Sequence, residues 1–167
     1  MIMTQVEVGD FQSNPLDTLE DVLKANEWPF DRAAEDQLVV ETVGRWCDYR
    51  MLFVWRAEIN ALYFSCALDT KVPVEKRGEI NHLLVKANEI LWFGHFEMCS
   101  SEFAPLFRHT MLTRGMRGIA VEQLEDLMDI AVGECDRFFP AFQFLIWGGM
   151  SAQDALDSAM LETVGKA

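Results

Sequence analysis

The chain has 167 residues, of which half are hydrophobic and a quarter are charged, a composition typical of one globular domain with its own core. Its 27 acidic and 14 basic residues give a formal net charge of −13. A nucleic-acid-binding protein needs a basic surface, as does a protein that docks on anionic lipid. The charge therefore argues against both nucleic acid and membrane as partners.

The four cysteines, Cys47, Cys66, Cys99 and Cys135, are far apart, and no two of them form a Cys-x-x-Cys pair. This spacing matches neither a redox motif nor a zinc knuckle, so we expect free thiols, several of them buried, in a reducing compartment. The N-terminal residues lack a basic stretch followed by an apolar one. We therefore expect no secretory signal and a cytoplasmic location.

Residues 1–13 are expected to form a flexible tail, and residues 14–167 a single domain, because no linker or internal repeat interrupts them. The stretch NPLDTLEDVLKAN predicts the first helix. Asn14 can cap this helix, Pro15 suits its first position, and leucines at helical spacing form one apolar stripe. We expect the helix to end near Asn26.

A run of short strands follows, over residues 28–32, 37–43, 49–57 and 61–69. These segments are rich in β-branched and aromatic residues and are separated by short turns, which predicts an antiparallel meander. Apolar residues fall on both faces of the predicted sheet. We therefore expect helices over one face and partial cover, for instance by a second subunit, over the other.

Residues 73–92 predict a second amphipathic helix, and Pro73 can start it. Residues 92–99 and 105–114 predict a further strand pair, joined by the turn SSEFA. The predicted fold class is therefore α+β, with an antiparallel sheet, made of the meander and the later strand pair, that is packed by helices.

From residue 121 onward, apolar residues recur at intervals of three and four, through the segment FFPAFQFLIW. This spacing predicts a long helix over residues 121–147 whose apolar stripe is buried against the sheet. Pro140 must kink this helix or split it in two. The apolar segment is well short of the about 20 residues that a membrane span needs. Gly148 and Gly149 can end the helix, and Ser151 with Asp154 can cap a last short one.

We find no motif for catalysis, neither a Gly-rich phosphate loop nor a Gly-x-Ser-x-Gly nucleophile elbow. Glu79 and His82 have the Glu-x-x-His spacing of a di-iron helix, but one copy on a solvated helix face indicates only a surface coincidence. His95, Glu97 and His109 could ligate zinc or a similar ion if the strand pair places them on one sheet face. The alternative is the solvent-exposed side of a hairpin. We expect no metal, no cofactor and no catalytic residue.

The tryptophans and methionines indicate either core or a surface for another protein. Because an antiparallel sheet in a lone domain usually leaves one face wet, apolar residues on both faces predict a homodimer. The interface is expected to use the sheet or the second helix, with the candidate residues Trp46, Met51, Phe53, Trp55, Ile80 and Leu84. The choice between these two surfaces stays open at this point.

The order of these elements resembles that of the YbjN family of bacterial proteins. So do the stretches NPLDTLEDVLKANEWPFDR, GRWCDYR, KVPVEKRGEIN, LFRH, EQLEDLMDIA and FFPAFQFLIWGGMSAQDAL, and the resemblance covers nearly everything after residue 13. It implies a fold like that of type III secretion chaperones, which are small α+β homodimers that hold a segment of a client protein. Members are described as sensory-transduction regulators, and the resemblance transfers no catalytic residue.

Two functions are compatible with these observations. The first is a non-enzymatic, homodimeric adaptor or regulator, chaperone-like, that binds an unidentified protein client in signal transduction or stress regulation. The alternative is a small-molecule-binding or metal-binding protein, or an enzyme, that uses a pocket near His95 and His109. The sequence predicts extensive apolar faces and few clusters of polar side chains, which favours the adaptor or regulator.

Overall fold

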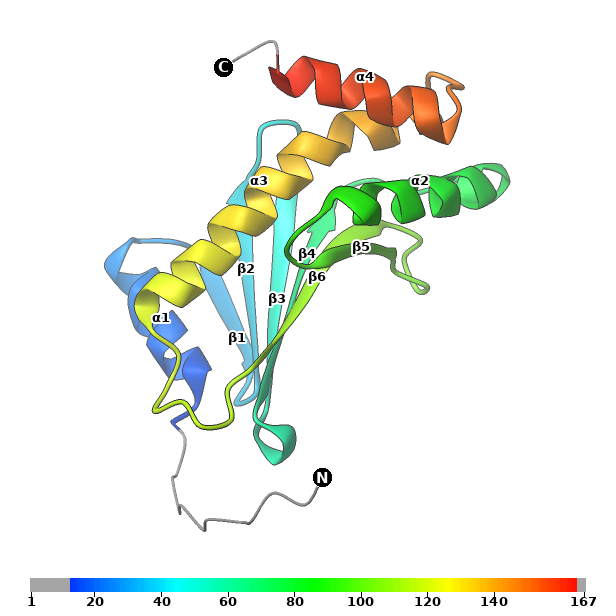
Figure 1. Ribbon diagram of the computed structural model, residues 1–167. Helices are drawn as coiled ribbons and strands as arrows, with labels where there is room; N and C mark the ends of the chain where they lie inside the picture. The colour runs from blue at the N-terminus through cyan, green and yellow to red at the C-terminus, as the bar shows by residue number, and fades with distance from the viewer. Residues whose placement is uncertain (1–12, 165–167) are drawn as a thin grey trace, which may run out of the picture.

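A computed structural model of the chain describes residues 13–164 (Figure 1). Its helices, 3-10 turns and strands are, in chain order, α1 (Pro15–Ala25), β1 (Phe30–Ala34), β2 (Gln37–Val43), β3 (Asp48–Arg56), η1 (Ala57–Ile59), β4 (Ala61–Leu68), η2 (Val74–Lys76), α2 (Arg77–Ile90), β5 (His95–Met98), β6 (Pro105–Leu112), α3 (Val121–Ile146) and α4 (Ala152–Val164). The expected α+β class is confirmed. The expected tail, residues 1–13, lies outside the described residues except for Ser13.

The first helix begins where its cap predicts. Asn14 has an extended backbone, and its side-chain oxygen accepts a hydrogen bond from the backbone N–H of Leu16 at 3.0 Å. Pro15 occupies the first helical position, where a missing N–H costs nothing. Leu16, Leu19 and Leu23 are buried and form the predicted stripe.

The six strands form one antiparallel sheet in the order β1-β2-β3-β4-β6-β5. The first four strands form the expected meander, and the later pair extends it through β6, which leaves β5 at the edge. In Figure 1 all four α-helices lie on one side of this sheet. We call the covered side the inner face and the opposite side the outer face.

Alternation along β3 shows how the sequence divides between these two faces. Met51, Phe53 and Trp55 point to the inner face and are buried. Leu52 and Val54 point to the outer face and are partly exposed. One face is therefore core, and the other remains uncovered by the chain's own helices.

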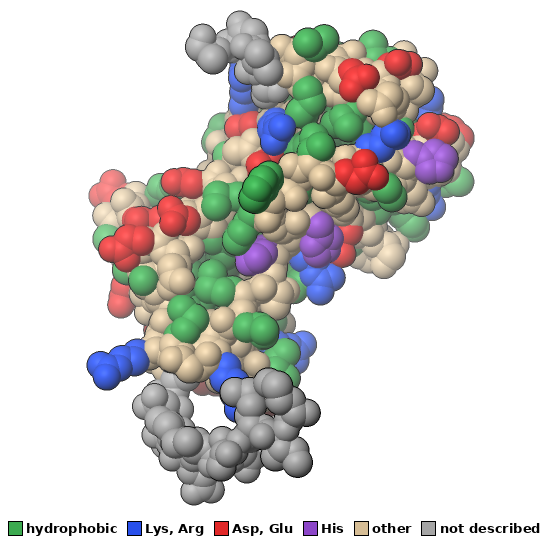
Figure 2. Space-filling model, in the orientation of Figure 1, with side chains coloured by type: hydrophobic (Ala, Val, Ile, Leu, Met, Phe, Trp, Pro, Cys, Tyr) green, Lys and Arg blue, Asp and Glu red, His purple; other side chains and the backbone are tan. Residues whose placement is uncertain are grey.

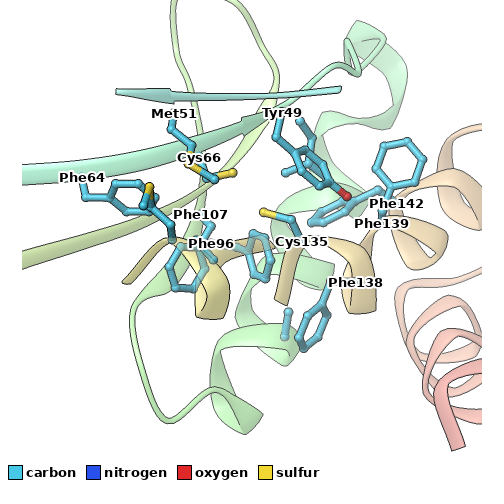
Figure 3. Close-up of a cluster of buried hydrophobic side chains, with 14 of the residues drawn as sticks. Tyr49, Met51, Phe64, Cys66, Phe96, Phe107, Cys135, Phe138, Phe139 and Phe142 are labelled. Atoms are coloured by element: carbon cyan, nitrogen blue, oxygen red, sulfur yellow. The ribbon is translucent and has the colours of Figure 1, made fainter. Parts of the chain in front are cut away.

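The helix α3 crosses the inner face and carries the aromatic segment into the core. Phe138, Phe142 and Leu145 are completely buried, as their spacing predicts. Phe96 of β5 packs edge-on against Phe138 and Phe142, with ring centroids 5.2 and 5.7 Å apart (Figure 3). The helix runs unbroken through Pro140, so it is not split in two.

The last helix, α4, packs on α3 and α2. Gly149 has φ +66°, the left-handed conformation expected after a helix end. Ser151 Oγ accepts a hydrogen bond from the backbone N–H of Asp154 at 3.2 Å and donates one to the Asp154 carboxylate at 2.7 Å. The expected cap is therefore confirmed.

The free edge of β5 is closed by a side chain of α2. The backbone N–H of Phe96 donates to Asn88 Oδ1 at 2.7 Å, and Asn88 Nδ2 donates to the Phe96 carbonyl at 2.9 Å. An exposed strand edge is a template for pairing with another chain. Asn88 therefore occupies backbone groups that another strand could otherwise bind.

Candidate functional site

The two histidines of the strand pair lie on opposite faces of the sheet. His95 pairs with Arg108 and points to the outer face. Glu97, two residues further along the strand, points to the same face. His109 pairs with the buried Phe64 and points to the inner face. The expectation that His95, Glu97 and His109 share one face is therefore wrong. The register of the hairpin differs by one residue from the assumed one, and a one-residue slip moves a side chain to the other face.

Each of these side chains has partners other than a metal ion. His109 stacks on Phe93 with ring centroids 3.8 Å apart, and burial, with a smaller contribution from His95, lowers the pKa of its imidazole. Glu97 accepts from Arg108 at 3.2 Å and lies 3.6 Å from His95 Nε2. Across residues 13–164, no three His, Cys, Asp or Glu side chains gather in a way that could hold a metal ion.

Five of the six residues expected at a dimer or partner interface lie in the core. Met51, Phe53 and Ile80 are completely buried, and Trp55 and Leu84 are 6 % and 8 % exposed. The interface expectation for these five is therefore wrong for the folded chain. They belong to the inner face of β3 and the core-facing side of α2. The partly exposed apolar residues of β3 alternate with them along the strand and point to the outer face.

The sixth, Trp46, is 40 % exposed and belongs to a hydrogen-bonded cluster around Asp136. The Asp136 carboxylate accepts from the Tyr49 hydroxyl at 2.6 Å and from the backbone N–H of Arg45 at 2.8 Å. The Trp46 indole N–H donates to the backbone carbonyl of Asp136 at 2.9 Å. These bonds join the β2–β3 turn to the middle of α3.

Pro140 explains why that carbonyl is available. In an α-helix the carbonyl of Asp136 would accept from the N–H of residue 140, but proline has no N–H. The Trp46 indole supplies the missing donor. Sequence reasoning missed this cluster because its members are about 90 residues apart in the chain.

Tyr49, which donates its hydroxyl to this cluster, is buried in the core (Figure 3). Burial, and then the hydrogen bond to Asp136 and the charge of that carboxylate, raise the pKa of the Tyr49 hydroxyl well above its usual value. The phenol therefore stays neutral and acts as a fixed hydrogen-bond donor. The role that follows from these contacts is structural, because they hold the β2–β3 turn against α3.

The cysteines are free thiols in two kinds of environment. Cys66 and Cys135 are completely buried between β4 and α3 (Figure 3), and burial with the neighbouring Cys66 raises the pKa of Cys135. Cys99 is partly exposed in the β5–β6 turn, where hydrogen bonding from Ser101 lowers its pKa. The expected burial of several thiols is confirmed for Cys66 and Cys135.

The most exposed large apolar side chain among the described residues is Trp92, which is fully exposed in the turn between α2 and β5. The next residue, Phe93, stacks on His109 and so holds the turn on the inner-face side of the sheet. Gly94 has φ +64°, and a Cβ there would lie 2.8 Å from the Arg108 carbonyl, so the turn requires glycine. Figure 2 shows hydrophobic and histidine side chains at the surface of the molecule in the same orientation as Figure 1.

The outer face is a second surface that sequence reasoning only half anticipated. Leu52 pairs with Val39 across β2–β3, and Val54 pairs with Tyr63 across β3–β4. All four are partly exposed. The Arg108 guanidinium lies 4.8 Å over the Tyr63 ring. A sheet face turned to water usually carries polar residues. These four side chains instead form an apolar patch on the outer face.

Comparisons with known proteins agree on one family. A family model described as "Putative bacterial sensory transduction regulator", named YbjN, matches residues 15–144. No curated protein matches the sequence. The chain is similar to the solved structure titled "Crystal structure of YbjN, a putative transcription regulator from E. coli". The identity is 16%, the TM-score is 0.52, and the alignment covers 72% of this chain and 85% of that one.

These matches agree with the architecture of the described residues. At this level of identity the structural similarity supports the fold alone, a six-stranded antiparallel sheet with helices. Between residues 13 and 164, no helix is both long enough and apolar enough to cross a membrane, the 26-residue α3 included.

Proposed function

The chain belongs to the YbjN family of bacterial regulators, and from this premise we propose that it is a non-enzymatic, homodimeric adaptor that regulates by binding another protein. In this proposal it acts in the cytoplasm, and the partner is a protein client held in a chaperone-like manner. The family description supports a regulatory role. The exposed aromatic turn around Trp92 is the observation that favours a protein partner.

Trp92 has the properties of an interface anchor. Tryptophan is among the residues most enriched at the energetic centres of protein interfaces, because it buries a large area and retains an N–H donor. Leaving such a side chain in water exposes apolar surface that a partner would bury. Its complete exposure therefore supports a role in binding.

The turn that carries Trp92 is held on both sides. Ahead of it, α2 is joined to β5 by the two Asn88–Phe96 hydrogen bonds. Behind it, Phe93 stacks on His109. A side chain presented on an ordered turn loses less conformational freedom on binding than one on a mobile loop. We propose that Trp92 is the anchor for the client.

The test is photo-crosslinking in the native cell, followed by mass spectrometry. A chain carrying a crosslinker at position 90, where Ile90 is exposed at the end of α2, should capture a defined protein. Trp92→Ala should reduce that capture about 30-fold, as expected for loss of an anchor worth about 2 kcal/mol. Trp147→Ala is the matched control, because Trp147 is 67 % exposed at the end of a different helix. It should leave the capture unchanged.

Two results would contradict this proposal. Equal capture by Trp92→Ala and by the unchanged chain would remove the anchor. No protein partner, together with a saturable small ligand that changes His109 resonances, would favour the alternative function as a small-molecule-binding protein.

A further inference from the structure

A cavity of about 180 Å³ lies between the end of α1 and the first turns of α3. Its apolar walls are Val22 and Leu23 of α1, Trp28 after this helix, and Met128 of α3. An apolar cavity of about 150 Å³ holds a benzene ring, so this cavity can hold one large apolar side chain. Met128 suits such a site, because methionine adapts its shape to what it contacts.

The end of α1 holds Trp28 at this cavity. The backbone N–H of Trp28 donates to the Leu23 carbonyl at 2.9 Å, and that of Glu27 donates to the Lys24 carbonyl at 3.2 Å. With φ +57° at Glu27, these two bonds form a Schellman motif, which fixes the path of the chain as it leaves the helix. The Trp28 side chain is nevertheless 37 % exposed. The motif therefore leaves part of this aromatic wall for another molecule to cover.

Five exposed acidic residues form a rim around the cavity. Glu125 and Asp129 line it, and Glu27, Glu122 and Asp126 lie on the adjoining turns. Between residues 13 and 164, none of these five carboxylates forms an ion pair within 4.0 Å. Figure 2 shows Asp and Glu side chains gathered over this part of the molecule, at the left of the view.

Helix stability does not account for the acidic rim. The helix dipole favours acidic residues only within the first turn of α3, which includes Glu122 but not Glu125 or Asp129. Like charges four residues apart on a helix, such as Glu125 and Asp129, are destabilising. The rim therefore carries negative charge at a cost to the helix that bears it.

Basic residues on neighbouring elements do not neutralise the rim. Lys24 and Arg32 form ion pairs of 2.6 to 3.2 Å with acidic residues of α1 that are not part of it. Arg45 lies over the ring of Trp46, which is bonded to Asp136 about two turns further along α3. These three cations are therefore already engaged or distant.

The loop before α3 carries Arg114 and Arg117, but it approaches the opposite end of α1. A Cβ on Gly118 would lie 3.7 Å from the Oγ of Ser13, which precedes that helix. The 11 residues of α1 span about 16 Å, and the cavity lies at the far end. This length exceeds the Debye length of about 8 Å at physiological salt, so these arginines are screened from the rim.

We propose that the cavity and its acidic rim bind a short basic segment of another protein, with one large apolar side chain of that segment in the cavity and lysines or arginines on the rim. Apolar burial supplies affinity, and charge complementarity supplies selectivity. The same negative charge opposes nucleic acid and anionic lipid.

This inference goes beyond the proposed function and uses a different surface. Trp28 precedes β1 at one edge of the sheet, whereas the Trp92 turn precedes β5 at the other edge (Figure 1). Client capture through Trp92 is therefore measured separately, and the failure of either proposal leaves the other intact.

The first test is the binding of a fluorescein-labelled peptide in which lysines flank a central phenylalanine, measured by fluorescence anisotropy with the full chain. Binding should be saturable. Replacing the phenylalanine of the peptide with alanine should raise the Kd at least about tenfold, because the cavity then stays empty. Replacing the lysines with glutamates should abolish binding. Equal Kd values for the phenylalanine and alanine peptides would overturn the role of the cavity.

The second test separates the rim from the overall charge of the protein. Glu125→Lys combined with Asp129→Lys should raise the Kd of the phenylalanine peptide at least about tenfold. Glu89→Lys combined with Glu162→Lys is the matched control, because it makes the same change in net charge at exposed positions of α2 and α4. Circular dichroism should show both variants folded. Equal weakening by the two variants would overturn the site, since only the net charge would then matter.

The third test examines the aromatic wall. Trp28→Ala should raise the Kd of the phenylalanine peptide and leave the Kd of the alanine peptide unchanged, because the wall contacts only the apolar side chain. A loss of folding would instead weaken both peptides. In the unchanged chain, the peptide should shift the backbone amide resonances of residues 22–28 and 125–129. Shifts confined to other residues would place the peptide elsewhere and contradict the proposal.

Discussion

Asp136 is the residue on which the contacts between the β2–β3 turn and the long helix converge. Its carboxylate binds Tyr49 and the backbone of Arg45, and its carbonyl binds Trp46. A carboxylate that accepts two hydrogen bonds in a partly buried site is strongly held. Trp46, which the sequence analysis suggested as an interface residue, is therefore held in place by its hydrogen bond to this cluster.

The pH dependence of stability should report on Tyr49. Its pKa is raised in the folded protein, so the folded state holds the phenolic proton more tightly than the unfolded chain does. The stability from this bond is complete below about pH 10, the ordinary tyrosine pKa, and falls by about 1.4 kcal/mol per pH unit above it. Tyr49→Phe lacks this proton. Above about pH 10, its free energy of unfolding should therefore fall with rising pH by about 1.4 kcal/mol per pH unit less than that of wild type.

Urea denaturation at about pH 9, 10 and 11 measures this difference, over a window that spans the usual tyrosine pKa of about 10. Tyr63→Phe is the control, since Tyr63 is partly exposed on the outer face and is the only other tyrosine. Equal slopes for wild type and Tyr49→Phe would show that burial and Asp136 do not hold the phenol neutral.

At the scale of elements, the effects on stability of substitutions at Pro140 and at Trp46 should depend on each other. Trp46→Phe removes the donor to the Asp136 carbonyl and should cost about 1 kcal/mol. In a Pro140→Ala background the alanine N–H can bond that carbonyl, so the same change should cost much less. A double-mutant cycle by chemical denaturation measures the coupling, and additive effects would show that the carbonyl does not need Trp46.

The second prediction about elements concerns the β5 edge. Asn88→Ala removes both bonds to Phe96 and should cost about 1–3 kcal/mol, because the backbone groups lose their partners. Asn81→Ala is the control, since Asn81 is exposed on the same helix. A loss below about 0.5 kcal/mol for Asn88→Ala, measured by urea denaturation, would show that water satisfies this edge equally well.

At the scale of the whole molecule, the sheet separates two surfaces that differ in what covers them. The Trp92 turn on the inner-face side is the surface proposed for a client, and the outer face carries the apolar patch of Val39, Leu52, Val54 and Tyr63. The homodimer of the proposed function would present two Trp92 turns at once. Such bivalent presentation raises the avidity for a client with repeated sites.

Elemental analysis of the whole protein should find no stoichiometric metal. His95 and His109 lie on different faces, His109 stacks on Phe93, and Glu97 is paired with Arg108, so these candidate ligands do not converge. The protein must be purified without chelator. One zinc, iron or manganese per chain, lost in His95→Ala, would contradict this expectation and favour the alternative function.

Local patterns in the sequence were sufficient for most elements of this protein. The cap at Asn14, the meander over residues 37–69 and the three-four spacing of Phe138, Phe142 and Leu145 each depend on residues that are close in the chain. Propensity, capping and periodicity act over such short distances. The sequence by itself therefore determined the α+β class, the buried aromatic helix and the family.

Only the tertiary structure decided which side chains meet. The register of β5 against β6 separated His95 from His109, and the alternation along β3 buried Met51 and left Leu52 partly exposed. The helices covered one sheet face and left the other open, and Trp46 reached the carbonyl that Pro140 leaves without a donor. These outcomes depend on pairing between distant segments, because a one-residue change of register reverses every side chain while leaving local propensity unchanged.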